Sequence, residues 1–202
     1  MSEIYLVRHG ETVFNMKGRY QGQLDSPLTE YGVEQVSEVA HMLRVTVHDM
    51  SRMKVISSSL GRTLQTAQII CNTLGYDFSK VDIDDRLTEV SLGSWDGLTI
   101  SEIEEQFPGA LANTNQYNWY FNNPDGETYE MVVARVSSWL DSIRNFPGVI
   151  AISHGLSGRI LRGVYAKFEK TTALQLEVSQ NTIFKLSNGT IESIRFPFDY
   201  DF

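Results

Sequence analysis

The sequence has a single cysteine and no long apolar run, and each shortage excludes a class of protein. With Cys71 alone among 202 residues, neither a disulfide framework nor a thiolate metal site can form. Cys71 lies within the apolar helical pattern of residues 66–75, which favours a buried and unreactive thiol. No apolar stretch approaches the roughly 20 residues that a membrane-spanning helix needs. We therefore expect neither a disulfide-stapled domain nor a membrane span.

Basic residues and targeting signals are also scarce. The chain has 17 Lys and Arg against 25 Asp and Glu, a formal net charge of −8. Nucleic acids and anionic membranes select basic surfaces, so we expect neither as a partner. The N-terminus enters a strand-like segment without the basic and apolar regions of a signal peptide, which predicts a cytoplasmic protein. A phosphorylated small molecule is compatible with this charge, because a few arginines can reverse the field inside one cleft.

The histidines outside the strand ends do not form a metal-binding pattern. His41 and His48 are seven residues apart on a predicted amphipathic helix, without a carboxylate or thiolate beside them. We interpret both as surface residues. The sequence therefore predicts no metal site and no cofactor.

Strand-like and helix-like segments alternate along the chain. The predicted strands are 3–8, 54–58, 80–84, 148–153, 173–178, 182–187 and 190–196, the last two joined by a turn at 187–189. The predicted helices begin at residues 29, 60, 99, 127 and 158. This order predicts the α/β class, with a mainly parallel central sheet, helices on both of its faces and an antiparallel edge. We expect one domain over residues 1–202, in which residues 95–126 form an insertion over one rim of the sheet.

Polar and ionisable residues follow each of the four strands that we expect in the parallel part of the sheet. These residues are Arg8-His9, the segment 57–62 that ends in Arg62, Glu89, and His154-Gly155. In such sheets ligands bind at the carboxyl ends of the strands, so these side chains should meet at one rim. The coincidence of all four strand ends predicts a functional site there.

The residue types at this rim indicate phosphate chemistry. Arg8 and Arg62 carry planar guanidinium groups that suit phosphate oxygens. Arg62 and His154 both fall at the start of a predicted helix, where free N–H groups favour an anion. A neutral imidazole beside a phosphoryl group is a nucleophile, and an acid beside the leaving oxygen completes the displacement. Glu89, in an apolar setting, is the candidate acid.

The segments "LVRHGET" with Asn15 after it, "GRYQGQLDSPLTEYG", "SSSLGRTLQTA", "LTEVSLGSWDG" and "ISHG" together resemble the histidine phosphatase superfamily in its phosphoglycerate-mutase-like branch. The resemblance covers most of the chain in the same order. It implies a phosphoglycerate-mutase-like fold with His9 as the residue phosphorylated during turnover. It further implies that Arg8, Asn15, Arg62 and His154 bind the phosphate and that Glu89 is the proton donor. The sister acid-phosphatase branch carries His-Asp where this chain has His154-Gly155, which favours Glu89 as the acid.

Several residues keep two interpretations. Gln21 and Gly22 either contribute polar or backbone contacts to the phosphate or only shape their loop. The aromatic stretch 115–121 is either the core of the insertion or a wall against the substrate. The three serines 57–59 are interpreted as a turn that caps the next helix, because no G-x-S-x-G pattern surrounds them. The aromatic tail 196–202 packs on the domain edge or makes an oligomer contact, so a homo-oligomer is left open.

Three functions compete, namely a phosphatase, a phosphoglycerate mutase and an inactive module that binds a phosphorylated ligand. A mutase must hold an intermediate with a carboxylate and two phosphates, yet no Lys, Arg or His occurs between Leu87 and Ala134. The module is disfavoured because nucleophile, acid and cations are all present. The sequence therefore predicts a metal-independent phosphomonoesterase that acts on a small molecule. The acidic, aromatic insertion suggests an alcohol that is neutral or bears an amine, with a ring that stacks.

Overall fold

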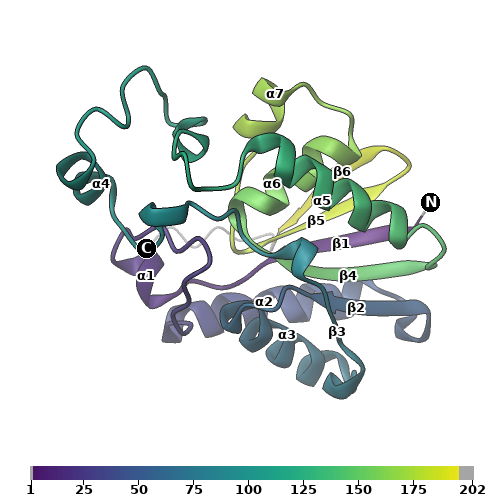
Figure 1. Ribbon diagram of the computed structural model, residues 1–202. Helices are drawn as coiled ribbons and strands as arrows, with labels where there is room; N and C mark the ends of the chain where they lie inside the picture. Colours follow the sequence, from purple (N-terminus) through teal and green to yellow (C-terminus); the bar gives the residue numbers. More distant parts are fainter. Residues whose placement is uncertain (1, 196–202) are drawn as a thin grey trace.

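The computed structural model describes residues 2–195 and is built on one six-stranded sheet (Figure 1). The order of the strands across the sheet is β3-β2-β4-β1-β5-β6. The first four in this order run parallel to their neighbours, whereas β5 is antiparallel to β1 and to β6. The strands are β1 (Glu3–Arg8), β2 (Met53–Ser57), β3 (Asp82–Ile83), β4 (Gly148–Ser153), β5 (Thr182–Ser187) and β6 (Thr190–Arg195). The predicted mainly parallel sheet with an antiparallel edge is confirmed.

The middle of the sheet follows from its side-chain pattern. All six residues of β4 are buried, as expected for a β-branched strand with a neighbour on each side and helices on both faces. Side chains of β1 alternate between the two faces, so Ile4 and Leu6 join one buried cluster while Tyr5 and Val7 join the other. The sheet thus separates two hydrophobic cores.

Helices cover both faces, as Figure 1 shows. On one face, α2 (Glu30–Thr46) and α3 (Gly61–Leu74) pack against the cluster that contains Tyr5 and Val7. On the other face lie α5 (Tyr129–Ser142), α6 (Gly155–Tyr165) and α7 (Lys170–Gln175). Among the helices of residues 2–195, none is both long enough and apolar enough to cross a membrane.

Two helix starts and one helix end have the local chemistry that the sequence predicts. Thr29 accepts a hydrogen bond from the Gly32 N–H at the start of α2. Thr99 and Glu102 form a capping box at the start of α4 (Ile100–Gln106). Gly75 ends α3 in the left-handed conformation with φ of 67°.

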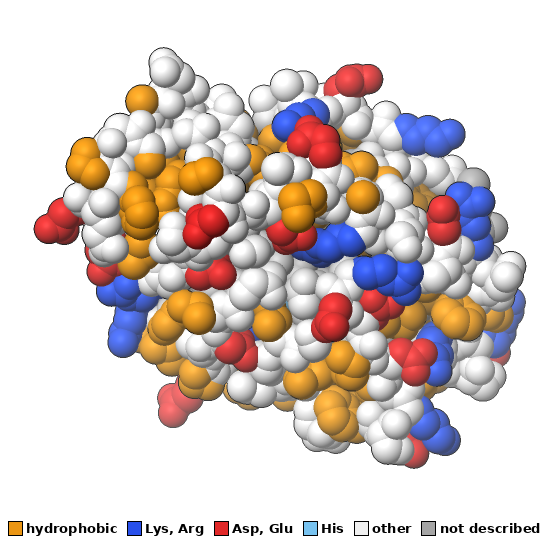
Figure 2. Space-filling view, in the orientation of Figure 1, with side chains coloured by type: hydrophobic (Ala, Val, Ile, Leu, Met, Phe, Trp, Pro, Cys, Tyr) orange, Lys and Arg blue, Asp and Glu red, His pale blue; other side chains and the backbone are white. Residues whose placement is uncertain are grey.

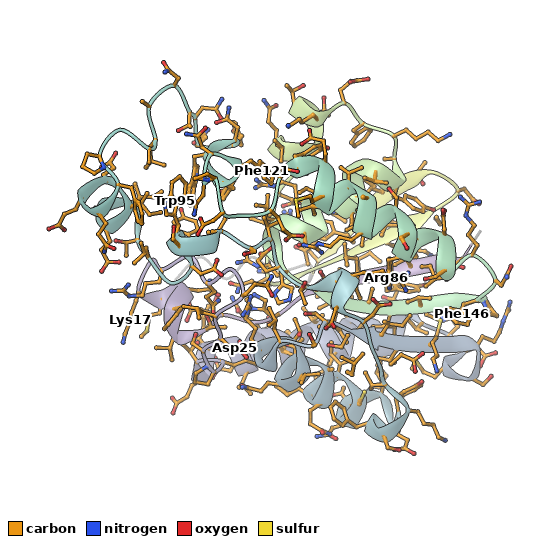
Figure 3. All side chains as sticks on the ribbon, viewed as in Figure 1. Lys17, Asp25, Arg86, Trp95, Phe121 and Phe146 are labelled. Carbon is orange, nitrogen blue, oxygen red and sulfur yellow. The ribbon has the colours of Figure 1, made fainter. Side chains whose placement is uncertain are left out.

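The segment 95–126 leaves the sheet after β3 and returns to α5. It holds α4 and two short 3₁₀ turns, Gly93–Trp95 at its start and Trp119–Phe121 near its end. Trp95, Ile103 and Trp119 are buried and belong to the same cluster as α5 and α6. The insertion is therefore anchored to the main core, and Figure 3 shows Trp95 and Phe121 on its two sides.

Two strand predictions are corrected and one helix was missed. Residues 173–178 are not a strand, because 170–175 form α7, whose adjacent residues Ala173 and Leu174 are both buried; a half-buried strand would alternate. The strand at 80–84 is reduced to Asp82–Ile83, since a 3₁₀ turn occupies 78–80. The stretch 9–28, for which no helix was predicted, contains the one-turn helix α1 (Val13–Met16), which Thr12 caps. The tail 196–202 lies outside the described residues.

Candidate active site

The carboxyl ends of the parallel strands converge on one cavity of about 270 Å³. It opens where β1, the loop after it, the start of α3 and the insertion meet. Seven of the predicted site residues line it, namely Arg8, His9, Asn15, Gln21, Gly22, Arg62 and Glu89. Arg19, Tyr20 and Tyr120 line it as well. The predicted residues His154 and Gly155 lie next to this group but do not line the cavity itself.

His9 is buried at the end of β1, and its contacts define its tautomer. Its Nδ1 lies 2.8 Å from the Gly10 carbonyl oxygen, which can only accept, so Nδ1 carries the proton. The Arg62 Nε–H donates to His9 Nε2 at 3.3 Å, so that nitrogen carries no proton and accepts through its lone pair. Burial, and then the charges of Arg8 and Arg62, lower the pKa of His9 well below its ordinary value of 6.5. His9 is thus a neutral imidazole with an unprotonated Nε2.

Arg62 is fully buried at the start of α3 and is held by the loop 22–25. Its Nη1 donates to the Leu24 carbonyl oxygen at 2.7 Å and to Asp25 Oδ1 at 3.0 Å, and its Nη2 donates to the Gly22 carbonyl oxygen at 2.9 Å. Asp25, the last residue of this loop, is labelled in Figure 3. With its Nε–H on His9, four of the five guanidinium N–H groups are used, which leaves one on Nη2 for a ligand.

Arg8 ends β1 with most of its donors free. One Nη1–H donates to the Val178 carbonyl oxygen, and the buried Nε has no partner among the described residues. Burial is the largest effect on Arg8 and lowers its pKa, while Glu89 opposes this shift. A cation buried with unused N–H groups is costly unless an anion joins it. The geometry therefore fits an anion between Arg8 and Arg62.

His154 packs against His9 behind the cavity. The two ring centroids are 5.2 Å apart, edge to face. His154 Nε2 lies 2.8 Å from Ser58 Oγ, and its buried Nδ1 has no partner in the part of the chain that is described. Burial, and then Arg62, lower the pKa of His154 well below 6.5. Ser58 is thus a partner of His154, a contact 96 residues apart in sequence.

The prediction that the serines cap α3 is wrong. The N-cap residue of that helix is Leu60, which makes no side-chain cap hydrogen bond. Ser57 Oγ donates to the Ser58 carbonyl oxygen, so these two serines shape the turn, and the Ser58 hydroxyl contacts the histidine. Gly155 lets the Arg8 side chain pack closely against the start of α6, because a Cβ at position 155 would lie 3.3 Å from the guanidinium carbon of Arg8.

Asn15 and Gln21 present amide groups whose oxygens are already used. The Asn15 Oδ1 accepts from the Thr12 N–H and from Gln180 Nε2, both at 3.2 Å. The Gln21 Oε1 accepts from Ser26 Oγ at 3.0 Å. The amide nitrogens of both side chains remain as donors at the cavity. Both residues can therefore donate to an anion.

Gly22 shapes the loop directly after Gln21. Its φ of 50° is in the left-handed region, and a Cβ would lie only 1.6 Å from Asp96 Oδ1. Asp96 in turn accepts from the Gln23 N–H at 3.0 Å and the Leu92 N–H at 2.8 Å. Burial raises the pKa of Asp96. Gly22 is required by the loop, and its carbonyl also holds Arg62.

The Glu89 side chain lies at the start of α6 and accepts hydrogen bonds there. Its Oε1 accepts from the Ser157 N–H and its own neighbour Val90 N–H, both at 2.9 Å, and its Oε2 accepts from the Leu156 N–H at 3.2 Å. The free N–H groups of a helix N-terminus suit a carboxylate. The carboxyl group is thereby fixed at the wall of the cavity.

Arg135 on α5 supports Glu89 from outside the cavity. It pairs with Glu127 at 2.8 Å and donates to the Arg86 carbonyl oxygen at 2.8 Å and to Ser157 Oγ at 3.0 Å. Ser157 Oγ also donates to the Thr88 carbonyl oxygen at 2.6 Å. This network connects α5, α6 and the loop before Glu89. The sequence reasoning missed it; the only local signal was one acid and one arginine eight residues apart.

The aromatic stretch 115–121 contains one residue of the core and one residue that lines the cavity. Trp119 is 5% exposed and belongs to the main core. Tyr120, next in sequence, lines the cavity, and its ring packs 4.3 Å from Trp119 and 6.2 Å from Tyr20, centroid to centroid. Aromatic rings therefore line the cavity together with its arginines.

The predicted exposure of His41 and His48 and the predicted burial of Cys71 are confirmed, but His48 is not on the helix of His41, since α2 ends at Thr46. His41 and His48 are exposed, and Cys71 is fully buried with a pKa raised by that burial to about 11. Within residues 2–195, no three His, Cys, Asp or Glu side chains gather in a way that could hold a metal ion.

The sequence and the fold both match known proteins. The model of the histidine phosphatase superfamily, branch 1, matches residues 4–193. A protein of Yersinia pestis (strain Pestoides F) named "Probable phosphoglycerate mutase GpmB" is 36% identical over 163 residues, which are 78% of this chain and 71% of that protein.

Two solved structures share the whole architecture. YhfR of Bacillus stearothermophilus superposes with a TM-score of 0.79 at 27% identity, covering 97% of this chain and 96% of its own. A mycobacterial glucosyl-3-phosphoglycerate phosphatase, solved in complex with VO3, has a TM-score of 0.76 at 27% identity and covers 98% of this chain and 99% of its own. The chain belongs to the histidine phosphatase superfamily, branch 1, and is an enzyme of the histidine phosphatase type.

Proposed function

We propose that this protein is a metal-independent phosphomonoesterase that hydrolyses a small phosphorylated metabolite through a phosphohistidine at His9. One observation carries the proposal: a neutral His9 has its Nε2 lone pair at a cavity lined by the buried Arg62 and the partly buried Arg8, both of which keep N–H groups free among the described residues. The phosphatase name of a structural neighbour with 27% identity supports the same reaction.

In the first step, the His9 Nε2 lone pair attacks phosphorus and the bond from phosphorus to the ester oxygen breaks. Arg8, Arg62, Asn15 and Gln21 donate to the phosphoryl oxygens, whose charge they balance as it spreads over them. The Gly10 carbonyl oxygen holds the Nδ1 proton, so the imidazolium that forms keeps its orientation. His154 lies against the ring and supports it, with Ser58 fixing His154 in turn.

The alcohol leaves with a proton from Glu89 in its acid form. Glu89, then a carboxylate, takes a proton from water, and the hydroxide attacks phosphorus as the bond between phosphorus and Nε2 breaks. Inorganic phosphate leaves, and His9 and Glu89 regain their starting protonation states. A positioned acid of this kind contributes about 10²–10⁴-fold to the rate. The network of Ser157 and Arg135 holds Glu89 where it can serve both the leaving ester oxygen and the attacking water.

The covalent step is tested with the nucleophile removed. His9→Ala should abolish hydrolysis of p-nitrophenyl phosphate, and acid-labile label from a ³²P-phosphomonoester should appear on the wild-type protein alone. His41→Ala, at an exposed position, is the matched control and should keep both signals. Hydrolysis that persists in His9→Ala would mean direct attack by water and would end the covalent scheme.

A phosphoglycerate mutase is the second candidate, because a relative at 36% identity carries that name. A mutase would return the phosphoryl group from His9 to a glycerate whose carboxylate is held by cations. The insertion offers none, since residues 88–134 contain no Lys, Arg or His. In Figure 2 the insertion, at upper left, carries acidic and hydrophobic side chains and no basic one. Water should therefore intercept the phosphoenzyme first.

The two candidates separate in one assay. Given 3-phosphoglycerate and a trace of 2,3-bisphosphoglycerate, the protein should release free phosphate far faster than it forms 2-phosphoglycerate. Rapid equilibration of the two monophosphates with little phosphate release would show a mutase. No reaction with any phosphoester would show a module that only binds its ligand.

A further inference from the structure

The three arginines that line the cavity are not equivalent. Arg8 and Arg62 line the cavity beside His9, Arg62 fully buried and Arg8 partly buried. Arg19 borders the cavity on the side of the insertion, with 32% of its side chain exposed. A cation there would face the alcohol part of a bound phosphomonoester rather than its phosphoryl group, which Arg8 and Arg62 hold.

The Arg19 guanidinium is engaged by the insertion. Its Nη1 donates to Glu102 Oε2 and its Nη2 to Glu102 Oε1, each at 2.7 Å, a two-pronged ion pair. Nη1 also donates to the Gly97 carbonyl oxygen at 2.7 Å. Three bonds therefore hold this side chain against the first turn of α4.

Glu102 is itself fixed, so the pair cannot simply rotate apart. Its Oε2 accepts from the Thr99 N–H at 2.9 Å while its own N–H donates to Thr99 Oγ1, the capping box of α4. Hydrogen bonds from Arg19 and then from Thr99 lower the pKa of Glu102, so it is ionised at neutral pH. The charge of Arg19 is matched by one carboxylate at hydrogen-bond distance.

We propose that Glu102 is a specificity-determining residue that neutralises Arg19 and so disfavours phosphomonoesters whose alcohol carries a carboxylate or a second phosphate, relative to those with an uncharged alcohol. This inference rests on the proposed phosphatase function and adds its substrate class, an uncharged or amine-bearing alcohol. No basic residue of 88–134 can replace Arg19 in attracting a second anion. The remaining groups near it at the cavity, Tyr20 and Tyr120, offer rings to a neutral alcohol.

The test compares two ligands of equal size that differ in charge. Competitive inhibition constants for 3-phosphoglycerate and glycerol 3-phosphate are measured against p-nitrophenyl phosphate, in low salt to limit screening. In Glu102→Gln the capping box survives, since Gln also serves at that position, but Arg19 loses its counter-charge. The preference for 3-phosphoglycerate over glycerol 3-phosphate should rise by about fivefold, the upper range for a partly exposed ion pair.

Two further variants identify the cause. Glu105→Gln makes the same charge change at an exposed position of α4 and should leave the ratio of inhibition constants unchanged. Arg19→Gln/Glu102→Gln removes both charges and should return the ratio to the wild-type value. Thermal unfolding of each variant shows that it is folded.

The outcomes are distinct from those of the phosphatase test. Hydrolysis of p-nitrophenyl phosphate with an unchanged ratio in Glu102→Gln would overturn the role of Glu102 and leave the proposed function intact. An equal rise in Glu105→Gln, or a rise that persists in the double variant, would show a general field effect and overturn it too. If no hydrolysis occurs, the proposed function fails, and the same ratio is measured by titration calorimetry with the two ligands.

Discussion

Replacement of Arg135 by Gln should destabilise the protein and slow proton delivery at the same time. Arg135 and Glu127 expose only 16% and 18% of their side chains, and Arg135 also donates to the Arg86 carbonyl oxygen and to Ser157. Removing one partner of a buried ion pair costs about 3–5 kcal/mol, whereas an exposed pair contributes about 0–1 kcal/mol. Since this pair is mostly but not fully buried, we expect a loss of about 2–3 kcal/mol in the free energy of unfolding.

Urea unfolding at pH 7 measures this loss directly. In thermal unfolding the same change should lower the midpoint by about 5–10 °C for a chain of this size. Arg144→Gln is the matched control, because Arg144 also pairs with an acid near the end of α5, but with 72% of its side chain exposed. The control should change the free energy of unfolding by less than about 0.5 kcal/mol.

The same variant has a kinetic signature that a purely structural role would not produce. Ser157 loses one of its two side-chain partners, so the N–H that it donates to Glu89 is less well fixed. Hydrolysis of an alkyl phosphate, which needs the acid, should therefore slow more than hydrolysis of p-nitrophenyl phosphate. If Arg135→Gln is as stable as Arg144→Gln, the network does not support the loop, and an equal slowing of both substrates would refute the link to Glu89.

Three further predictions concern the site itself. Glu89→Gln should slow alkyl phosphates by about 10²–10⁴-fold but p-nitrophenyl phosphate far less, because an activated leaving group needs no proton; equal losses would make Glu89 structural. Activity should survive dialysis against chelator and be inhibited by vanadate, since arginines supply the charge that Mg²⁺ supplies elsewhere; a rate restored only by added metal would contradict this. Burial lowers the pKa of His9 and His154 well below 6.5, so just below pH 6.5 these histidines gain protons in the unfolded chain and not in the folded protein. As the pH falls from 6.5 to 5.5, each of the two histidines should therefore reduce the free energy of unfolding by about 1 kcal/mol. In His154→Asn, the free energy of unfolding should fall less over the same pH range.

Several predictions that depended on a short stretch of chain were accurate. The strands 3–8 and 148–153 and the capped helix starts at Thr29 and Thr99 follow from side-chain alternation and from hydrogen bonds within a few residues. The strand prediction for 173–178 was wrong because the apolar residues of this segment fit the periodicity of a helix as well as that of a strand. The segment 170–175 is a helix in which Ala173 packs against Gly163 of α6.

The sequence by itself determined which ionisable side chains lie at the strand ends, because the apolar runs of β1 and β4 are followed directly by Arg8-His9 and by His154. Parallel strands bring these ends to one rim of the sheet. Only the tertiary structure decided which side chains support them. Ser58 meets His154 across 96 residues, Arg19 meets Glu102 across 83, and Glu89 reaches the start of α6 across 67 to 68. Such contacts depend on how the loops and the insertion pack over the sheet, and no local pattern in the chain encodes that packing.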